Sequence, residues 1–301
     1  MGDSALEKEI VRTGFARAEL GESPRFDAET RTVSWVDLVA GRLWLAHAAP
    51  DDPVAAWEPE AQPLIEVPGP LGCAVRTTSG GWLLASGGTV FRWRAGTAPT
   101  PLAVLEPDTD TARLNDGAVD AEGRFWVGSM SVPRPLKPWG RLHVLDHEGT
   151  SVGGRVVRAG MLAANGIAWS PDGSTCYAVD SGHRLIHRVK AASGELLGPA
   201  GPPLSVPAGV PDGITVDDEG CLWVALWDAA AVVRLSPQGQ VLQRVTMPCS
   251  RPTSCALLGS RLVICTATLP GEAASGWTYT VEVAVGGPAA PRARVPGEPT
   301  A

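Results

Sequence analysis

Short apolar segments alternate with turn sequences along most of the chain, and no stretch of twelve residues shows a convincing apolar period of 3.6. The segments RFWVGSM, TCYAVDS and CLWVALW are rich in β-branched and aromatic residues, and they follow the turn sequences DAEG, SPDG and DDEG. In such turns an Asp side chain can cap its own backbone, and Gly can adopt a positive φ. The pattern therefore predicts a series of β-hairpins with little helix.

The hairpin pattern returns six times along the sequence. The copies begin at Glu22, Gly72, Gly117, Gly166, Gly213 and Ser254, and the successive starts are 50, 45, 49, 47 and 41 residues apart. This spacing is typical of one four-stranded propeller blade. A single sheet of this size needs stacked neighbours to bury both of its faces. We therefore predict an all-β fold, a six-bladed β-propeller, with residues 1–301 forming a single domain.

The two ends of the chain fit closure of this ring. The segment EIVRTGFARAEL (residues 9–20) predicts a strand that completes the last blade. The tail from Gly286 is rich in Pro, Ala and Gly, so we expect residues 10–285 to be ordered and residues 286–301 to form a flexible tail. The insertion from His47 to Pro63 is expected to be a polar loop between the first and second blades.

The composition supports this interpretation and excludes several classes of protein. The 301 residues include 35 Gly, 27 Pro and 11 Trp, a combination that a disordered chain would lack. Gly does not recur at every third position, as it would in collagen. The prediction places four aromatic residues at one point of the repeat, where they would pack between blades: Trp35, Trp126, Tyr177 and Trp223.

Charge and cysteine usage limit the compartment and the partners. The formal net charge is −7 and the sequence pI is about 5.3, which argues against a nucleic-acid partner. There is no run of eighteen apolar residues and no apolar core of a secretory signal near the charged N-terminus. The six cysteines form no CxxC pair, which is ordinary for reduced, buried thiols. We expect a cytoplasmic protein that is a monomer or a weak homo-oligomer, with no membrane partner.

Polar residues interrupt the pattern where the predicted inner strands start. Four of the six repeats carry a carboxylate or an amide there, in the sequences LGESP (Glu22), RLNDG (Arg113, Asn115, Asp116), AANG (Asn165) and VPDG (Asp212). Inner strands surround the propeller axis, so these oxygen atoms should converge. A set of oxygens without His or Cys suits calcium, magnesium or manganese. The alternative is turn chemistry, because Asn-Gly and Asp-Gly are common turn dipeptides.

The same sequences resemble those of a known family. GESPRFDAETRTVSWVDLVAGRLW, RLNDGAVDAEGRFWVGSM, NGIAWSPDGSTCYAVDS and PDGITVDDEGCLWVALWDAAAVVRLSPQG are similar to the senescence-marker-protein, regucalcin and gluconolactonase family, in the family's order and over roughly residues 15 to 270. The resemblance implies a six-bladed propeller with one divalent metal ion in its central channel. It favours calcium, with zinc, manganese and magnesium as alternatives. It also implies hydrolysis of a sugar lactone, the small-molecule partner.

The resemblance assigns roles to individual residues. Glu22, Asn165 and Asp212 match the family's metal ligands, and Asp212 also matches its catalytic acid/base. Arg113 and Asn115 match residues that bind substrate oxygens. The implied mechanism is physically reasonable, because a dication polarises a carbonyl and stabilises the oxyanion that forms when water attacks. Three further residues are candidates for lining the pocket at the same end: Met130, His183 and Trp227.

One loop departs from the family pattern, so the resemblance does not decide which lactone is the substrate. After GSM the family often has an acidic residue, whereas this chain has SVPRPLKPWG with Arg134 and Lys137. A basic, Pro-stiffened lid would suit an acidic or differently shaped lactone. A sugar lactone such as gluconolactone, opened to its onic acid, is the expected substrate. The alternatives are a non-catalytic, regucalcin-like calcium-binding protein, a hydrolase of a non-sugar lactone or ester, and an interaction scaffold, against which the axial carboxylates argue.

Overall fold

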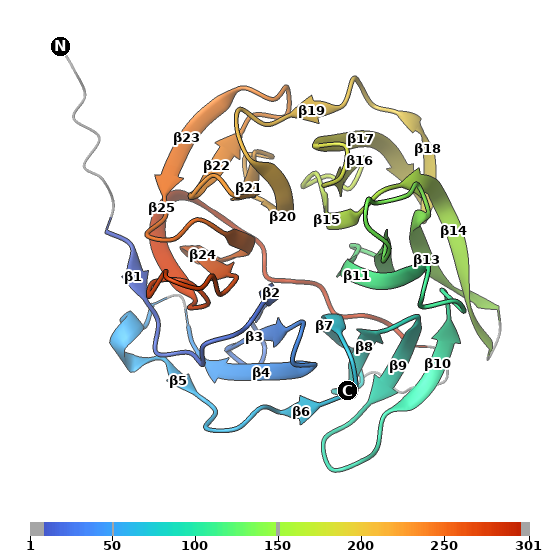
Figure 1. Ribbon diagram of the computed structural model, residues 1–301, viewed down its shortest axis with the longest axis horizontal. Helices are drawn as coiled ribbons and strands as arrows, with labels where there is room; N and C mark the ends of the chain where they lie inside the picture. The colour runs from blue at the N-terminus through green and yellow to red at the C-terminus, as the bar shows by residue number, and fades with distance from the viewer. Residues whose placement is uncertain (1–8, 50, 149–150, 296–301) are drawn as a thin grey trace.

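Six antiparallel sheets are arranged as blades around a central axis (Figure 1). The computed structural model describes residues 9–49, 51–148 and 151–295. The first strands of neighbouring blades contact one another all round the ring, so they line its central channel. All six predicted repeat starts, from Glu22 to Ser254, lie in these first strands. The fold is therefore the predicted six-bladed β-propeller.

The first three blades follow in chain order. The first contains β2 (Gly21–Asp27), β3 (Thr32–Asp37), β4 (Arg42–His47), β5 (Glu58–Pro59) and β6 (Ile65–Glu66). The second contains β7 (Leu71–Arg76), β8 (Trp82–Ser86), β9 (Thr89–Trp93) and β10 (Thr100–Val104). The third contains β11 (Ala112–Val119), β12 (Phe125–Ser131), β13 (Gly140–Glu148) and β14 (Ser151–Met161).

The remaining three blades complete the ring. The fourth contains β15 (Ala164–Trp169), β16 (Thr175–Asp180), β17 (Leu185–Ala192), β18 (Glu195–Pro199) and β19 (Leu204–Ser205). The fifth contains β20 (Val210–Val216), β21 (Leu222–Trp227), β22 (Ala231–Leu235) and β23 (Val241–Thr246). The sixth contains β24 (Pro252–Thr266), β25 (Tyr279–Gly287) and β1 (Val11–Arg12).

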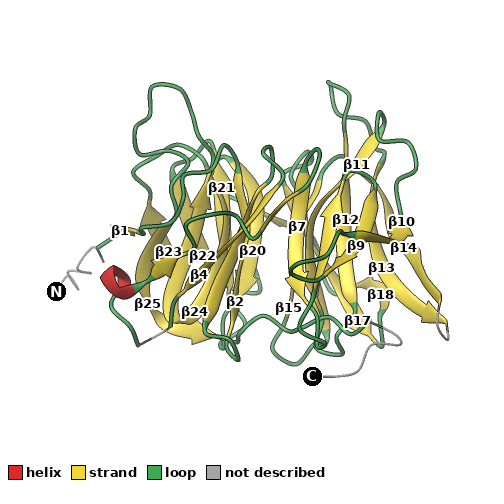
Figure 2. Ribbon diagram, turned by 90° about the horizontal axis from the view of Figure 1, so that it is seen from below, coloured by secondary structure: helices red, strands yellow, loops and turns green. Residues whose placement is uncertain are grey.

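The predicted hairpin turns form as expected and define one end of the channel. In the DAEG turn the Gly123 amide donates to the Asp120 carbonyl over 2.9 Å, and Gly123 has a φ of 84°. The DDEG turn has the same bond, from Gly220 to Asp217, also at 2.9 Å, and Gly220 has a φ of 77°. We call this end of the ring the lower end, and it lies at the bottom of Figure 2.

The N-terminal strand closes the ring, as predicted. β1 pairs with β25 in antiparallel register, with Val11 opposite Thr280 and Arg12 opposite Tyr279. The first and last parts of the chain therefore belong to the same blade. The helix content is as small as expected: among the described residues only a three-residue 3-10 turn, Val54–Ala56, is helical. No helix in this part of the chain is long and apolar enough to cross a membrane.

The tail differs from the expected flexible segment. Residues 288–295, which we call the C-terminal strap, cross the lower end of the ring, and Figure 1 shows this last part of the chain in red crossing the centre on the far side. The Ala293 amide donates to the Arg76 carbonyl over 2.8 Å, and Ala293 is fully buried. The Arg292 guanidinium makes two 2.7 Å hydrogen bonds to Asp27. Residues 296–301 of the predicted tail lie outside the described residues.

The insertion after β4 also differs from expectation. It does not form a separate loop between blades, because β5 pairs with β4, with Pro59 opposite Ala46. Trp57 within it is 4% exposed and stacks on Phe15, with ring centroids 5.8 Å apart. An aromatic anchor of this size explains why the insertion folds onto the first blade as part of its outer edge.

The recurring aromatic residues pack between blades, as predicted. All four are buried in apolar clusters that join two neighbouring blades: Trp35, Trp126, Tyr177 and Trp223. Trp126 packs against Ala164 and Cys176 of the following blade, whereas Trp35 packs against Val263 and Cys265 of the preceding one. The expectation that all four occupy one point of the repeat is therefore wrong for Trp35.

Candidate functional site in the central channel

The polar residues of the four inner strands lie at β-bulges. The pairing register shifts between Glu22 and Arg25, between Leu114 and Gly117, between Ala164 and Ile167, and between Pro211 and Ile214. A bulge frees residues from the sheet ladder and turns their side chains. The four bulges lie near the upper end of the channel, opposite the hairpin turns, and each lies at or beside a polar residue singled out from the sequence.

The bulges rule out the turn interpretation of the Asn-Gly and Asp-Gly pairs. Gly117, Gly166 and Gly213 lie inside strands, and none of the three has a positive φ. Their glycines serve close packing instead: a Cβ on Gly213 would lie 2.2 Å from the hydroxyl oxygen of Ser254, and one on Gly166 would lie 2.5 Å from the amide nitrogen of Ile214. Glycine is needed here because adjacent inner strands approach too closely for a side chain.

Three carboxyl groups are gathered at the axis, and we call Glu22, Asp116 and Asp212 the axial cluster. They are only 6%, 8% and 6% exposed, respectively. Burial raises the pKa of Glu22 well above its usual range, and the negative charges of Asp212 and Asp116 raise it further. Burial and the charge of Asp116 likewise raise the pKa of Asp212. Arg25 compensates part of the charge of Asp116, but without a further positive charge Glu22 and Asp212 favour their protonated forms.

Two oxygens of the axial cluster have no hydrogen-bond partner. These are Oε2 of Glu22 and Oδ1 of Asp212, and both are fully buried. Buried polar atoms of this kind are rare and need a ligand or an ion to explain them. No group of three His, Cys, Asp or Glu side chains forms a metal site within the described ranges, so an amide or a carbonyl would have to complete the ligand set. Carboxylate and amide oxygens are the donors that calcium prefers.

Asn165 is held in an orientation that suits this role. Its Nδ2 atom donates to the Ser181 hydroxyl over 3.2 Å, and this hydroxyl donates to the carbonyl of Pro211 over 2.7 Å. Pro211 directly precedes Asp212, so the amide is tied to the strand that carries the neighbouring carboxylate. Because its nitrogen is engaged by Ser181, the Oδ1 atom of Asn165 is the end left for a ligand.

Arg113 and Asn115 form a hydrogen-bonded pair beside the axial cluster. Nη1 of Arg113 donates to Oδ1 of Asn115 over 2.9 Å, and Nδ2 of Asn115 donates to the Ala164 carbonyl over 3.0 Å. Burial and the positive charge of Arg134 lower the pKa of Arg113 to about 10, although the charge of Glu22 raises it. Asn115 therefore fixes the guanidinium directly, and the second Nδ2 hydrogen and the second Oδ1 lone pair are left for contact with a substrate.

The other three predicted lining residues have different surroundings. Met130 lies opposite Arg113 in the β11–β12 pair, next to the site. Nδ1 of the half-exposed His183 lies 2.7 Å from the buried carboxylate of Asp180, which holds the imidazole ring in place. Trp227 is covered by the Arg251 guanidinium, 4.7 Å from a ring centroid. In the described part of the chain no hydrogen bond or ion pair joins His183 or Trp227 to the axial cluster.

Asp116 was expected only as one of the converging oxygens, with no individual role, and Arg25 was not singled out, yet both lie in the channel. Nη2 of Arg25 is 3.6 Å from Oδ1 of Asp116, which also accepts a 2.8 Å hydrogen bond from the Gly117 amide. Below this pair the channel opens into a cavity of about 310 Å³, lined by apolar residues such as Ile167 and Ile214 and covered by Pro288 to Pro291. Asp116 follows Asn115 in the RLNDG sequence, so its place near the axis was predicted, although its contact with Arg25 was not.

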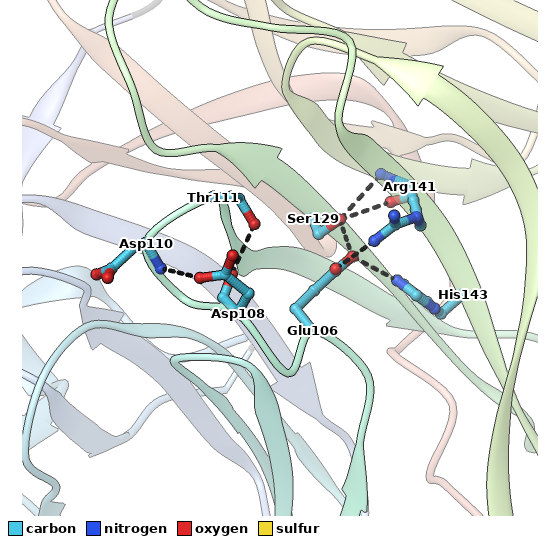
Figure 3. A network of polar contacts seen from close by, with 7 residues as sticks. All are labelled: Glu106, Asp108, Asp110, Thr111, Ser129, Arg141 and His143. Atoms are coloured by element: carbon cyan, nitrogen blue, oxygen red, sulfur yellow. Dashed lines mark hydrogen bonds and ion pairs between the residues drawn. The ribbon is translucent and has the colours of Figure 1, made fainter.

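Another buried carboxylate, Glu106, lies outside the channel between the second and third blades (Figure 3). Oε1 of Glu106 accepts a 2.6 Å hydrogen bond from the Ser129 hydroxyl and lies 2.9 Å from Nε2 of His143, while Oε2 accepts from Arg141 over 2.5 Å. We call these four residues the Glu106 cluster. The Ser129 hydroxyl donates to the carboxylate and not to the imidazole, so the cluster lacks the bond that activates a serine nucleophile.

Comparison with known proteins identifies the family. Residues 20–268 match the family model described as "SMP-30/Gluconolactonase/LRE-like region". The chain belongs to this family. The match includes all six inner strands and the whole axial cluster. The expected family is therefore confirmed.

Relatives within the family include named lactonases and regucalcins. The chain is 31% identical over 250 residues to 6-deoxy-6-sulfogluconolactonase of Pseudomonas putida, covering 81% of this chain and 80% of the relative. It is 33% identical to L-arabinolactonase of Azospirillum brasilense, covering 81% and 79%. It is 32% identical to regucalcin of Xenopus laevis, covering 80% of each protein.

Solved structures show the same architecture. A luciferin-regenerating enzyme matches with a TM-score of 0.82 at 23% identity, over 95% of this chain and 99% of that one. Regucalcin from Agrobacterium tumefaciens, described as a calcium-binding protein, matches with a TM-score of 0.78 at 25% identity, over 93% and 95%. The propeller fold of this chain is therefore supported by solved structures as well as by its sequence motifs.

Proposed function

We propose that this protein is a hydrolase that opens the ring of a sugar aldonolactone to the corresponding onic acid and depends on a divalent metal ion. The observation that carries the proposal is the pair of unpartnered, buried oxygens on Glu22 and Asp212, with Arg113 beside them. The names of the relatives from P. putida and A. brasilense, both lactonases, support the reaction class.

The residues available to hold the ion are Glu22, Asn165 and Asp212. Their oxygen donors fit a hard cation, and calcium is our first choice among calcium, zinc, manganese and magnesium. When bound, such an ion polarises the lactone carbonyl and stabilises negative charge on its oxygen. Its positive charge would also favour the ionised forms of Glu22 and Asp212, whose pKa values are raised by burial and by neighbouring carboxylates.

Asp212 is the proposed general base. Its carboxylate accepts a proton from a water molecule as the water oxygen bonds to the carbonyl carbon of the lactone. When the bond between that carbon and the ring oxygen breaks, the protonated Asp212 returns the proton to the leaving oxygen, which becomes a hydroxyl group. Arg113, held by Asn115, donates hydrogen bonds to substrate oxygens on the outer side of the axial cluster.

A second candidate is calcium binding without catalysis, and the regucalcin relatives of 32% and 25% identity favour it. This candidate requires the same axial oxygens but has no need of a fixed guanidinium beside them. The ordered contact between Arg113 and Asn115 therefore favours the hydrolase.

The proposal is tested with a pH-indicator assay over a panel of aldonolactones, with calcium and with a chelator. Asp212→Ala should lower kcat by about 10³-fold or more, since it removes both a metal ligand and the base. The matched control is Asp218→Ala, which removes an exposed carboxylate from the lower end of the same blade and should leave kcat unchanged. Calcium binding by the wild type without turnover of any lactone would instead identify the calcium-binding candidate.

A further inference from the structure

The loop between β12 and β13 forms a lid beside the site, and we define the lid as residues 132–139. It begins two residues after Met130, the cross-strand partner of Arg113. The Val132 amide donates to the Thr111 carbonyl over 2.9 Å, and the Lys137 amide donates to the Ser131 hydroxyl over 3.0 Å. These bonds fix both ends of the lid against the strands that position Arg113.

The lid carries two exposed cations without an acidic partner. Neither Arg134 nor Lys137 forms an ion pair among the residues that the structure describes. Asp108 and Asp110 lie in the loop before Thr111, to which the lid is bonded, and the carboxylate of Asp108 accepts a hydrogen bond from the Asp110 amide over 3.1 Å. The positive charge of Arg134 instead acts on another cation, Arg113.

Several arginines of this acidic chain are paired with carboxylates. Arg42 pairs with Glu66 at 2.8 Å, and Arg234 pairs with both Asp217 and Glu219 at 2.7 Å. With a formal net charge of −7, carboxylates are abundant. The guanidinium of Arg134 and the ammonium of Lys137, which have no carboxylate partner among the described residues, therefore form a site of positive potential on the lid, which attracts an anion.

The relative positions of the axial cluster, Arg113 and the lid indicate how a bound lactone would be oriented. Nη1 of Arg134 lies 3.5 Å from the carbonyl oxygen of Ser131, and Ser131 pairs with Ala112, which directly precedes Arg113. Arg113 in turn interacts with the charge of Glu22 in the axial cluster. A lactone whose carbonyl lies at the axial cluster would therefore extend past Arg113 toward the lid. Trp139 of the lid is 40% exposed and offers an apolar surface beside the cations.

We propose that the natural substrate is a lactone with an anionic group at the end remote from its carbonyl, and that Arg134, assisted by Lys137, binds this group. The chemical class includes carboxylate, sulfonate and phosphate substituents, all of which accept the paired N–H donors of a guanidinium. This inference rests on the proposed lactone hydrolysis, and it assigns specificity to residues outside the axial cluster.

The experiment compares a neutral and an anionic lactone of the same length, D-glucono-1,5-lactone and 6-phospho-D-glucono-1,5-lactone. Wild type should prefer the phosphorylated lactone by about tenfold or more in kcat/KM, and added NaCl should reduce this preference. Arg134→Gln should lower kcat/KM for the anionic lactone by roughly 10- to 100-fold, mainly through KM, and leave the neutral lactone within about twofold. Lys137→Gln should have a smaller effect in the same direction.

The matched control is Lys190→Gln, which removes an exposed positive charge from β17 on the fourth blade and should change neither substrate. Equal activity on both lactones, or an equal effect of Arg134→Gln on both, would overturn the anionic substrate and leave the hydrolase proposal intact. Calorimetry of 6-phosphogluconate and gluconate binding provides a second readout that does not need turnover. Binding of 6-phosphogluconate that is tighter than gluconate and lost in Arg134→Gln supports the lid site even if no lactone is hydrolysed, and absence of this difference refutes it.

Discussion

The axial cluster and the Glu106 cluster are two buried groups of ionisable residues with opposite electrostatic balance. Glu106 is 3% exposed and Glu22 is 6% exposed, so burial does not distinguish them. Burial raises the pKa of Glu106, but hydrogen bonds from His143 and Ser129 and the charge of Arg141 lower it below its usual range. Glu22 has other carboxylates as neighbours, and its pKa is raised.

This difference indicates that the Glu106 cluster stabilises the fold, whereas the axial cluster is arranged to bind a ligand. Around Glu106 each carboxylate oxygen has a donor, and the donors join the second blade to the third (Figure 3). Around Glu22 and Asp212 one oxygen of each carboxylate is unpartnered. A buried charge without a partner costs several kcal/mol, so a fold retains such an arrangement only where something outside the chain compensates for it.

The largest expected effect comes from Glu22→Gln, which keeps the shape of the side chain and removes its charge. Activity should fall by about 10³-fold, because a ligand of the proposed ion is weakened. The metal-free protein should become more stable, by about 1–3 kcal/mol, because one of three crowded negative charges is removed. The measurements are kcat on the preferred lactone and thermal unfolding in the presence of a chelator.

A Glu22→Gln variant that loses activity and is also less stable than wild type without metal would contradict the proposed difference between the axial cluster and the Glu106 cluster. It would mean that Glu22 contributes to the fold in the same way as Glu106. Calcium titration followed by thermal unfolding adds a second check, since the variant should show a much smaller stabilisation by calcium than wild type.

The sequence predicts the fold better than the site, for physical reasons that particular residues show. The turn at Asp120–Gly123 and the spacing of the repeats depend on local chemistry, so both are visible in the sequence. The bulge at Asn165 depends on the close approach of two inner strands, which the pair Asn-Gly does not distinguish from a turn. The strap was expected to be flexible because its composition is that of a linker, whereas its order comes from distant partners such as Asp27.

The Glu106 cluster shows the same limit more clearly. Its members come from the loop after β10 and from β12 and β13, and no short motif contains them. Only the stacking of the second blade on the third brings Glu106 to His143. By contrast, Glu22, Asn165 and Asp212 could be found because each occupies a similar place in a repeated unit.

The next largest effect is expected from Glu106→Gln, the same substitution in the other cluster. It removes the charge that Arg141 and His143 face and leaves one polar group of the buried cluster without its partner. The free energy of unfolding should fall by about 2–4 kcal/mol, measured by urea denaturation, while kcat changes less than about twofold. A large loss of kcat in a folded Glu106→Gln protein would show that this cluster, too, acts in the reaction.

The smallest effect is the pH dependence of stability, and its sign should differ between the clusters. Because the folded-state pKa of Glu22 is raised, its penalty is absent below the unfolded pKa of about 4.3 and grows as pH rises toward the folded value. Without metal, Glu22→Gln should therefore gain stability over wild type as pH rises from about 4, by roughly 2–4 °C for each kcal/mol.

The folded pKa of Glu106 is lowered, so its contribution to stability is present above about pH 4.3 and is lost as pH falls through the folded pKa. In acid, Glu106→Gln and Glu22→Gln should therefore both have about the same stability as wild type. As pH rises, Glu106→Gln should become less stable than wild type and Glu22→Gln more stable. Thermal unfolding of the three proteins from pH 3 to pH 8 with chelator measures both differences, and slopes of the same sign would show that the two carboxylates do not differ in their electrostatic role.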